Sequence, residues 1–81
     1  MSRYAWDPEK ERVNLGKHGV SFEEARDAIE HPLSRAELDL VHSGHEERSK
    51  IVGWSSTKGL LVVIVSLSGV QPRIISARRA T

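Results

Sequence analysis

The sequence predicts an α+β fold, in which two N-terminal helices pack on one face of a mainly antiparallel sheet of four or five strands. Two segments with helix boundary signals come first, within residues 7–32. The hydrophobic pattern then changes from a helical period to alternation and short apolar runs, which are typical of strands. The connections between these runs are short, and short connections permit only antiparallel neighbours.

The first helix is expected within residues 7–19, "DPEKERVNLGKHG". Asp7 is a favourable N-cap residue, and Pro8 fits the first helical position, where its missing N–H costs nothing. Gly19 suits the left-handed residue that ends a helix. The segment has few apolar residues, so this helix is expected on the surface.

The second helix has the clearest boundary in the chain. Ser21 precedes Glu24 by three residues, the spacing of a capping box, in which each side chain accepts a hydrogen bond from the other residue's backbone N–H. Pro32 ends the helix and favours an extended backbone at His31. The apolar residues of this segment share one face, which is expected to be buried: Phe22, Ala25, Ala28 and Ile29.

Four longer strands are expected after the helices, and one short strand before them. In "RAELDLV", residues 35–41, Ala36, Leu38 and Leu40 alternate with charged residues, as in a half-buried strand. The run "LLVVIVSLS", residues 60–68, is apolar on both faces and is expected at the centre of the sheet. The remaining strands are expected in "RSKIVGW" (48–54), "RIISA" (73–77) and Tyr4–Trp6.

Length and composition narrow the class of protein. The 81 residues are expected to form a single domain over 1–81. There is no cysteine, which excludes disulfides and thiolate metal ligands. The N-terminus has no apolar signal-peptide region, and the longest apolar run is far below the ~20 residues that span a membrane. We therefore expect a cytoplasmic protein that does not contact a membrane.

The histidines and the helical hairpin suggest two functions that the residues do not support. His42 and His45 have no recognised metal-site spacing, so a solvated loop is expected, with no metal and no cofactor. The hairpin "LGKHGVSFEEA" has the outline of a helix-turn-helix. Its second helix begins with Glu23 and Glu24, which DNA phosphates would repel, so helical packing is expected instead.

Positive charge gathers at the end of the chain. The last nine residues carry Arg73, Arg78 and Arg79 and no acid, whereas the net charge of the whole chain is only +1. Arginines at a strand end are commonly solvated, and an anionic partner such as nucleic acid or an acidic protein is the alternative. Arg73 and Arg78 differ in strand parity, so either a β-bulge intervenes or Arg78 lies beyond the strand end.

The chain also contains the residue types that RNA cleavage without a metal requires. The 2′-hydroxyl can attack the adjacent phosphate if the protein supplies a base, a proton donor and positive charge. Arg48 and Lys50 share a strand face with Val52 and Trp54. The candidate residues are Lys17, His18, Glu47, Arg48, Lys50, Arg73, Arg78 and Arg79.

Several segments, in the same order and spacing, resemble the BrnT family of toxins from bacterial type II toxin–antitoxin modules. They are "WD" at 6–7, "KHGVSFEEA" at 17–25, "EER" at 46–48, "LLVVIV" at 60–65 and "RIISAR" at 73–78. The resemblance implies a RelE/ParE-like fold and a ribonuclease that arrests translation. It also implies an antitoxin of the BrnA type, whose ribbon-helix-helix domain would bind operator DNA as part of the complex.

The resemblance also implies site residues. Arg48, Arg73 and Arg78 are expected to bind and stabilise phosphate, and His18 or Glu47 to transfer protons. Lys17, Lys50 and Arg79 are expected to contact RNA. Family members usually continue into a charged C-terminal helix, which this sequence is expected to lack because it stops at Thr81. The alternative function is a non-catalytic module that acts with its partner in operator binding.

Overall fold

The computed structural model describes residues 3–38 and 47–80, in which two helices precede four strands. No helix in these ranges is long and apolar enough to cross a membrane. The histidine-containing loop and the end of the first predicted long strand lie outside the described residues. The elements are α1 (Pro8–His18), α2 (Phe22–Glu30), β1 (Arg35–Leu38), β2 (Arg48–Ser55), β3 (Gly59–Ser66) and β4 (Arg73–Arg79).

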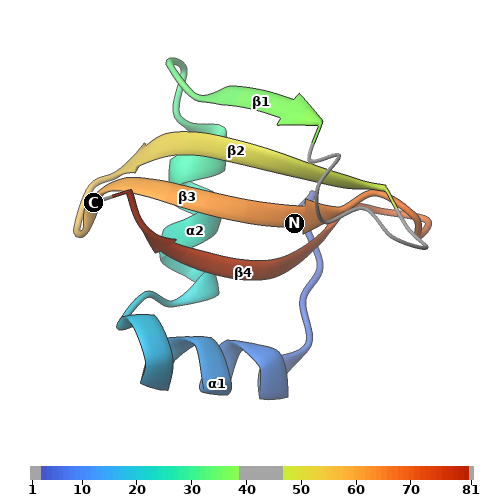
Figure 1. Cartoon of the computed structure of the whole chain (residues 1–81), viewed down its shortest axis with the longest axis horizontal. Helices are drawn as coiled ribbons and strands as arrows, with labels where there is room; N and C mark the ends of the chain where they lie inside the picture. The colour runs from blue at the N-terminus through green and yellow to red at the C-terminus, as the bar shows by residue number, and fades with distance from the viewer. Residues whose placement is uncertain (1–2, 39–46, 81) are drawn as a thin grey trace.

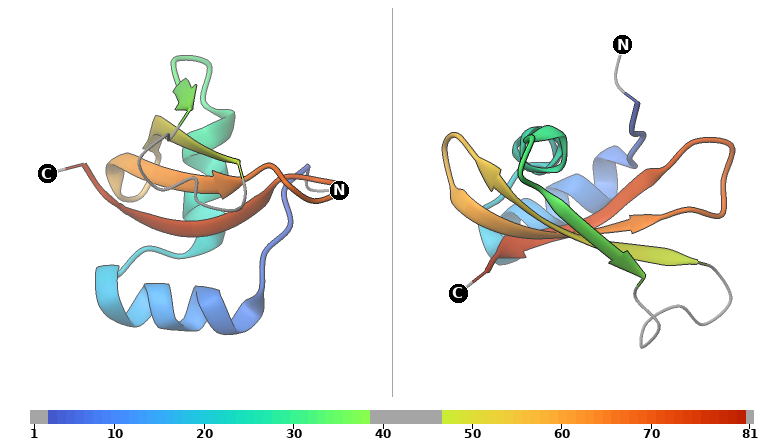
Figure 2. Two further views of the ribbon diagram at one scale, coloured as in Figure 1. Left: turned by 45° about the vertical axis from the view of Figure 1, so that its right-hand side comes forward. Right: turned by 90° about the horizontal axis from the view of Figure 1, so that it is seen from above.

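The strands form one antiparallel sheet in the order β1-β2-β3-β4. Figure 1 shows α2 crossing behind the sheet and α1 lying along the border formed by β4. Figure 2 shows the twist of the sheet and its other face, which neither helix covers. The predicted α+β class is confirmed, and the arrangement is compatible with a RelE-like fold.

The predicted strand at Tyr4–Trp6 is reduced to a single parallel bridge between Ala5 and Arg73. Ala5 N–H donates to the Pro72 carbonyl at 2.9 Å, and Ile74 N–H donates to the Ala5 carbonyl at 2.8 Å. The chain enters α1 immediately afterwards, so no longer ladder can form. The described sheet therefore has four strands.

The predicted helix boundaries are confirmed. Asp7 accepts a hydrogen bond from Glu9 N–H at 2.9 Å, and Gly19 has the left-handed φ of 69° that ends α1. Ser21 and Glu24 form the reciprocal capping box, with N···O distances of 3.1 and 3.0 Å. These local hydrogen bonds fix the start of α2 and the tight turn before it.

The core lies between α2 and the sheet. The apolar face of α2 is buried, as predicted, and packs on β2, β3 and β4. Trp6 packs edge-to-face on Phe22, with ring centroids 6.2 Å apart. Ala36 of β1 is exposed, contrary to the prediction of a half-buried strand, because β1 lies at the edge beyond the strands that α2 covers. The buried apolar residues include Val20, Phe22, Ala25, Ala28, Ile29, Ile51, Leu61, Val63, Val65, Ile74 and Ala77.

Gly53 sets how closely α2 approaches β2. A Cβ atom at this position would lie 2.0 Å from the backbone oxygen of Ala28 and 3.1 Å from the Cβ of Ser34. Both distances are below van der Waals contact, and the oxygen belongs to the helix backbone, which cannot rotate away. Only glycine fits here without moving the helix.

Two acidic residues of α2 hold the turn between β2 and β3. Asp27 accepts hydrogen bonds from the backbone N–H and the hydroxyl of Ser56 at 2.8 and 3.0 Å. Glu24 accepts one from the Thr57 hydroxyl and lies 3.7 Å from the Lys58 ammonium. The Ser21 N–H and then the Thr57 hydroxyl lower the pKa of Glu24, and the Ser56 N–H lowers the pKa of Asp27.

We expect Gly53→Ala to lower the free energy of unfolding by about 2–3 kcal/mol, because overpacking forces α2 away from the sheet. Gly16→Ala is the matched control, since Gly16 lies in α1 with no atom within 4 Å of an added Cβ. This control should stabilise the protein by about 0.5–1 kcal/mol through helix propensity. Urea unfolding measures both changes, and equal stability of Gly53→Ala and the wild type would contradict the close approach of α2.

The lowered pKa of Glu24 makes stability depend on pH. A carboxyl group whose pKa is lower in the folded state stabilises the protein above its unfolded pKa of about 4.3, and this contribution is lost as the pH falls through the folded value. We expect the thermal midpoint of Glu24→Gln to fall less than that of the wild type between pH 5 and pH 3. The exposed Glu23→Gln variant should follow the wild type, and parallel curves for all three proteins would show that this contact is not coupled to folding.

Candidate functional site

The cross-strand register assigns the charged side chains of the four strands, except Arg79, to one face of the sheet. We call the face opposite α2 the open face. Its side chains form transverse rows across the strands, because residues paired in an antiparallel ladder point to the same side. The rows are Arg48–Ser66–Arg73, Glu37–Lys50–Ile64–Ser76, Arg35–Val52–Val62–Arg78 and Trp54–Leu60.

A β-bulge in β4 puts Arg73 and Arg78 on the same face. Ser76 pairs with Ile64, and Ile74 pairs with the next residue, Val65, so Ile75 is the extra residue. Arg78 lies inside β4, which extends to Arg79. Of the two arrangements that the parity of the arginines left open, the structure has the bulge.

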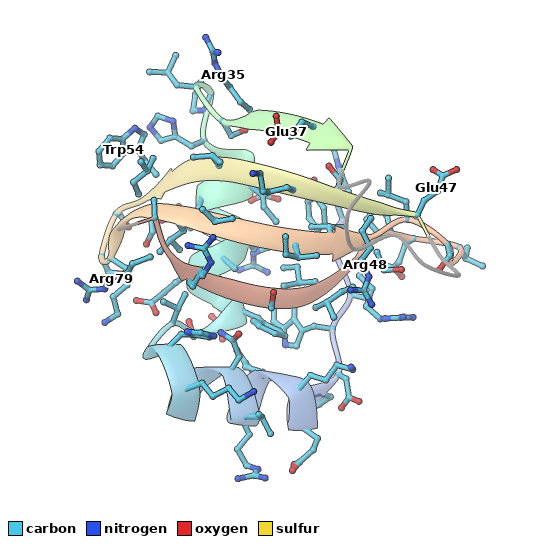
Figure 3. All side chains as sticks on the ribbon, in the orientation of Figure 1. Arg35, Glu37, Glu47, Arg48, Trp54 and Arg79 are labelled. Atoms are coloured by element: carbon cyan, nitrogen blue, oxygen red, sulfur yellow. The ribbon has the colours of Figure 1, made fainter. Side chains whose placement is uncertain are left out.

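Two arginines flank one position at the end of the sheet. Arg48 and Arg73 both neighbour Ser66 in the register, so their backbones lie about 10 Å apart, two strand spacings. Arg48 is half-buried with its Nε shielded from solvent, and Arg73 is exposed. Figure 3 shows Glu47 and Arg48 together at this end of β2 and Trp54 at the other end. A phosphate between the two arginines would be in reach of both guanidinium groups.

An apolar floor occupies the other half of the open face. Val52, Leu60 and Val62 lie beside Trp54, which is 50% exposed. Arg35 and Arg78 end the row that contains Val52 and Val62. The strand parity of Trp54 was visible in the sequence, but the place of Arg35 depends on the pairing of β1 with β2.

Lys50 lies in the middle of the open face and forms an ion pair with Glu37, with an N···O distance of 3.1 Å. Arg79 pairs with Leu61 of the core-facing row and therefore lies on the opposite face from Arg78. The structure thus brings Arg48, Lys50, Arg73 and Arg78 to one face and separates Arg79 from them.

Asn14 of α1 is a buried polar residue whose burial no pattern in the sequence predicts. Its amide donates to the carbonyls of Val20 and Ala77 at 3.0 and 2.9 Å, and its oxygen accepts from Ala77 N–H at 3.1 Å. Ala77 directly precedes Arg78, so this side chain fixes the backbone beside that arginine and attaches α1 to the edge of β4.

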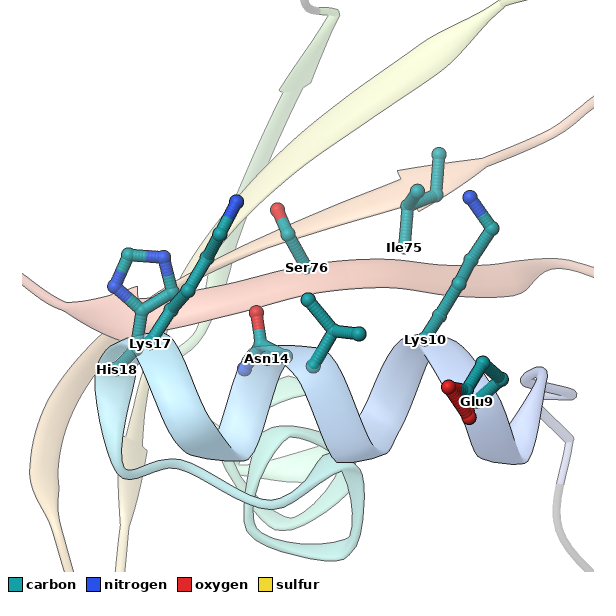
Figure 4. Close-up of a pocket in the computed structure, with 8 residues that line it drawn as sticks. Glu9, Lys10, Asn14, Lys17, His18, Ile75 and Ser76 are labelled. Atoms are coloured by element: carbon teal, nitrogen blue, oxygen red, sulfur yellow. The ribbon is translucent and has the colours of Figure 1, made fainter.

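The two candidates for proton transfer lie far from each other. Glu47 is exposed next to Arg48, at the end of the sheet where β4 begins. His18 is in the last turn of α1, where it lines a groove between α1 and β4 together with Lys17. Figure 4 shows Lys17 and His18 at the C-terminal end of this helix. One bound phosphate cannot contact both Glu47 and His18.

The described part of the chain includes two of the four histidines, His18 and His31. No group of three or more histidine, aspartate or glutamate side chains is positioned there to hold a metal ion. His42, His45 and Glu46 lie outside the described residues.

The fold and the open face define a small α+β protein with a cationic, partly apolar surface suited to a polyanion. The sequence model of a family described as the ribonuclease toxin BrnT of type II toxin–antitoxin systems matches residues 6–81, nearly the whole chain. The protein belongs to this BrnT family, and a type II toxin has a cognate antitoxin. A comparison with curated protein sequences finds no match.

We expect Asn14→Ala to lower the free energy of unfolding by about 3 kcal/mol, because buried groups of Ala77 and Val20 lose their hydrogen-bond partner. The neighbouring Val13→Ala should change it by less than about 0.5 kcal/mol, since Val13 is exposed on the same helix. Hydrogen exchange at the Ala77 amide provides the local measurement. Unchanged protection in Asn14→Ala would mean that α1 does not depend on this side chain.

Proposed function

We propose that this protein is a metal-independent ribonuclease that binds RNA on the open face and arrests translation. The observation that carries the proposal is the alignment of Arg48, Arg73 and Arg78 on one face, which depends on the bulge at Ile75. Family membership supports it independently, because the family is one of ribonuclease toxins. The proposed substrate and activity place the protein in the cytoplasm.

The proposed reaction uses the 2′-hydroxyl of the RNA as the nucleophile. The 2′-oxygen forms a bond to phosphorus while the bond to the 5′-oxygen of the next nucleotide breaks. The proton of the 2′-hydroxyl passes to a protein base, and the departing 5′-oxygen takes a proton from water. The base then releases its proton to the hydroxide that remains, which regenerates the base and water. The products are a 2′,3′-cyclic phosphate and a 5′-hydroxyl, and arginines stabilise the negative charge that builds up on the phosphate oxygens.

Within this proposal, Arg48 and Arg73 hold the scissile phosphate. Glu47 accepts the proton, because it lies at the same end of the sheet as these two arginines, whereas His18 lies on α1. Arg78 lies four β3 residues further along, about 13 Å at the usual strand rise, and contacts a different phosphate. Lys50 lies between these sites, where an RNA phosphate would compete with Glu37 for its ammonium group.

The apolar floor is suited to the bases of the same strand. An exposed tryptophan can stack on any base, and such stacking stabilises single strands by about 1–3 kcal/mol per base. Trp54 lies next to the row that ends in Arg78, so a base could stack there while its phosphate contacts the arginine. This arrangement favours single-stranded RNA over a duplex, whose bases are not accessible for stacking.

The proposed partner is a BrnA-type antitoxin with a ribbon-helix-helix domain. In this scheme the antitoxin neutralises the toxin, and the complex binds operator DNA through the antitoxin.

Arg79 lies on the face opposite the proposed RNA-binding face, so it would contribute only to longer-range attraction of RNA.

We expect Arg73→Ala to reduce RNA cleavage in the presence of a chelator by about 10²-fold, because one cation that stabilises the transition state is lost. Arg78→Ala should weaken RNA binding more than it slows bound-state cleavage. Glu47→Gln should slow bound-state cleavage, because it removes the proposed proton acceptor. Lys58→Gln removes a cation from the β2–β3 turn, where it pairs with Glu24 of α2, and is the matched control. Product ends are identified as 2′,3′-cyclic phosphates by mass spectrometry.

Cleavage that survives in a protein with both Arg73 and Arg78 replaced by alanine would contradict the assigned roles. Intact RNA with the wild type, together with partner-dependent shifts of operator DNA, would instead support a non-catalytic module. Inducible expression with and without the neighbouring gene, scored for growth arrest and RNA decay, tests the pairing with an antitoxin.

A further inference from the structure

The groove between α1 and β4 is lined by lysines and apolar side chains that are not part of the open face. Its volume is about 270 Å³, close to the lower limit of ~300 Å³ for small-ligand pockets. Val13 and the bulge residue Ile75 supply its apolar surface, Lys10 and Lys17 supply its positive charge, and His18 also lines it. Figure 4 shows Lys10 and Lys17 extending from α1 toward β4 on either side of Asn14.

The positive charge of the groove is not neutralised within the described part of the chain. Lys10, Lys17 and His18 form no ion pair there. The acidic member of the lining, Glu9, is held by Arg12, whose Nε lies 3.0 Å from both carboxylate oxygens and whose Nη2 also donates to one of them. This contact lowers the pKa of Glu9. Asn14 already uses its amide group on Val20 and Ala77. An incoming ligand therefore meets cations and an apolar surface.

The spacing of these groups matches a nucleotide strand better than a single small anion. Lys10 and Lys17 are seven residues apart, which is about 10 Å along the helix axis. Val13 lies between them on the same side of α1, opposite Ile75. Phosphates on the two sides of one nucleoside could contact the two ammonium groups, with the nucleoside against the apolar surface.

The groove is continuous with the open face through β4. Ser76 pairs with Ile64 in an open-face row and also lines the groove. Ile75 is the extra residue of the bulge, and a bulge redirects a side chain away from the regular alternation of the strand. A strand that leaves Arg78 can therefore cross β4 at Ser76 and enter the groove.

We propose that this groove is a second RNA-binding site, which holds a nucleotide flanking the segment bound on the open face. The inference rests on the proposed ribonuclease function and extends it, because it makes binding depend on RNA length. Lys10 and Lys17 bind the phosphates on either side of that nucleotide. His18 belongs to this second site and not to the reaction centre.

The test measures the salt dependence of binding with 2′-O-methyl RNA, which has no free 2′-hydroxyl and is not cleaved. Each phosphate contact with a single strand contributes about 0.7 to the slope of log K against log salt concentration. For a ten-nucleotide RNA, we expect the slope of K10A/K17A to be smaller than that of the wild type by about 1.4. A dinucleotide has a single phosphate, which cannot contact both lysines at once, so with it the slopes of wild type and variant should differ by no more than about 0.7.

Two further variants separate this effect from a loss of folding or of general charge. Val13→Glu puts a carboxylate between the lysines at an exposed position and should also weaken binding of the long RNA. Lys58→Gln removes a cation from the β2–β3 turn, which lines neither RNA surface, and should keep the wild-type slope. Thermal unfolding of each variant confirms that the comparison is made between folded proteins.

The outcomes distinguish this inference from the proposed function. A wild type that binds neither RNA would overturn the proposed function and the second site with it. Wild-type binding with an unchanged slope in K10A/K17A would overturn the second site alone. If K10A/K17A keeps the wild-type slope but loses affinity for the cognate antitoxin, the groove binds an acidic protein segment and the RNA assignment is wrong.

Discussion

The hydrogen bonds of Asn14 hold the helical hairpin and the sheet in one arrangement. A single side-chain amide satisfies both outward-pointing backbone groups of Ala77 and the carbonyl that follows the turn after α1. The edge of β4 is thereby closed to pairing with another chain, together with the bridge at Ala5. The cations of α1 and the arginines of β4 keep a fixed relation because this contact joins their two elements.

The small net charge results from acidic and basic residues that lie in different parts of the protein. The acids of the hairpin are engaged in structural contacts: Glu11 with the first N–H of α2, Glu24 with its own cap and the β2–β3 turn, and Asp27 with the same turn. The open face and the adjoining groove carry most of the remaining cations, so the molecule has a strong local field despite a formal charge of +1.

Features that depend on neighbouring residues were predictable from the sequence, and features that depend on pairing between distant segments were not. Asp7, Gly19 and the Ser21–Glu24 box carry their own signals, because a cap needs only residues a few positions away. Asn14 sits in a polar helix with no apolar period, so nothing marks it as buried before its partner 63 residues away is known.

In the candidate site, too, features that depend on pairing between distant segments were not predictable from the sequence. The shared face of Arg48 and Lys50 followed from strand parity alone, since the register of β2 has no interruption. To predict that Arg73 and Arg78 share a face, the position of the bulge had to be known. Ile75 is an ordinary strand residue, and nothing in the sequence marks it as the bulge. The role of Gly53 was likewise not predictable, because it depends on how closely α2 approaches β2.

The bulge also bears on how other members of the family are compared with this one. Ile75 has no partner on β3, so a relative that lacks this residue could keep all the cross-strand pairs on either side of it. Two arginines separated by four intervening residues here would then be equivalent to two separated by three there. A search pattern with one fixed spacing would miss such relatives, whereas an alignment that permits a gap at Ile75 would match both arginines. Such a relative would lack the part of the groove's apolar surface that Ile75 supplies and would keep the part that Val13 supplies.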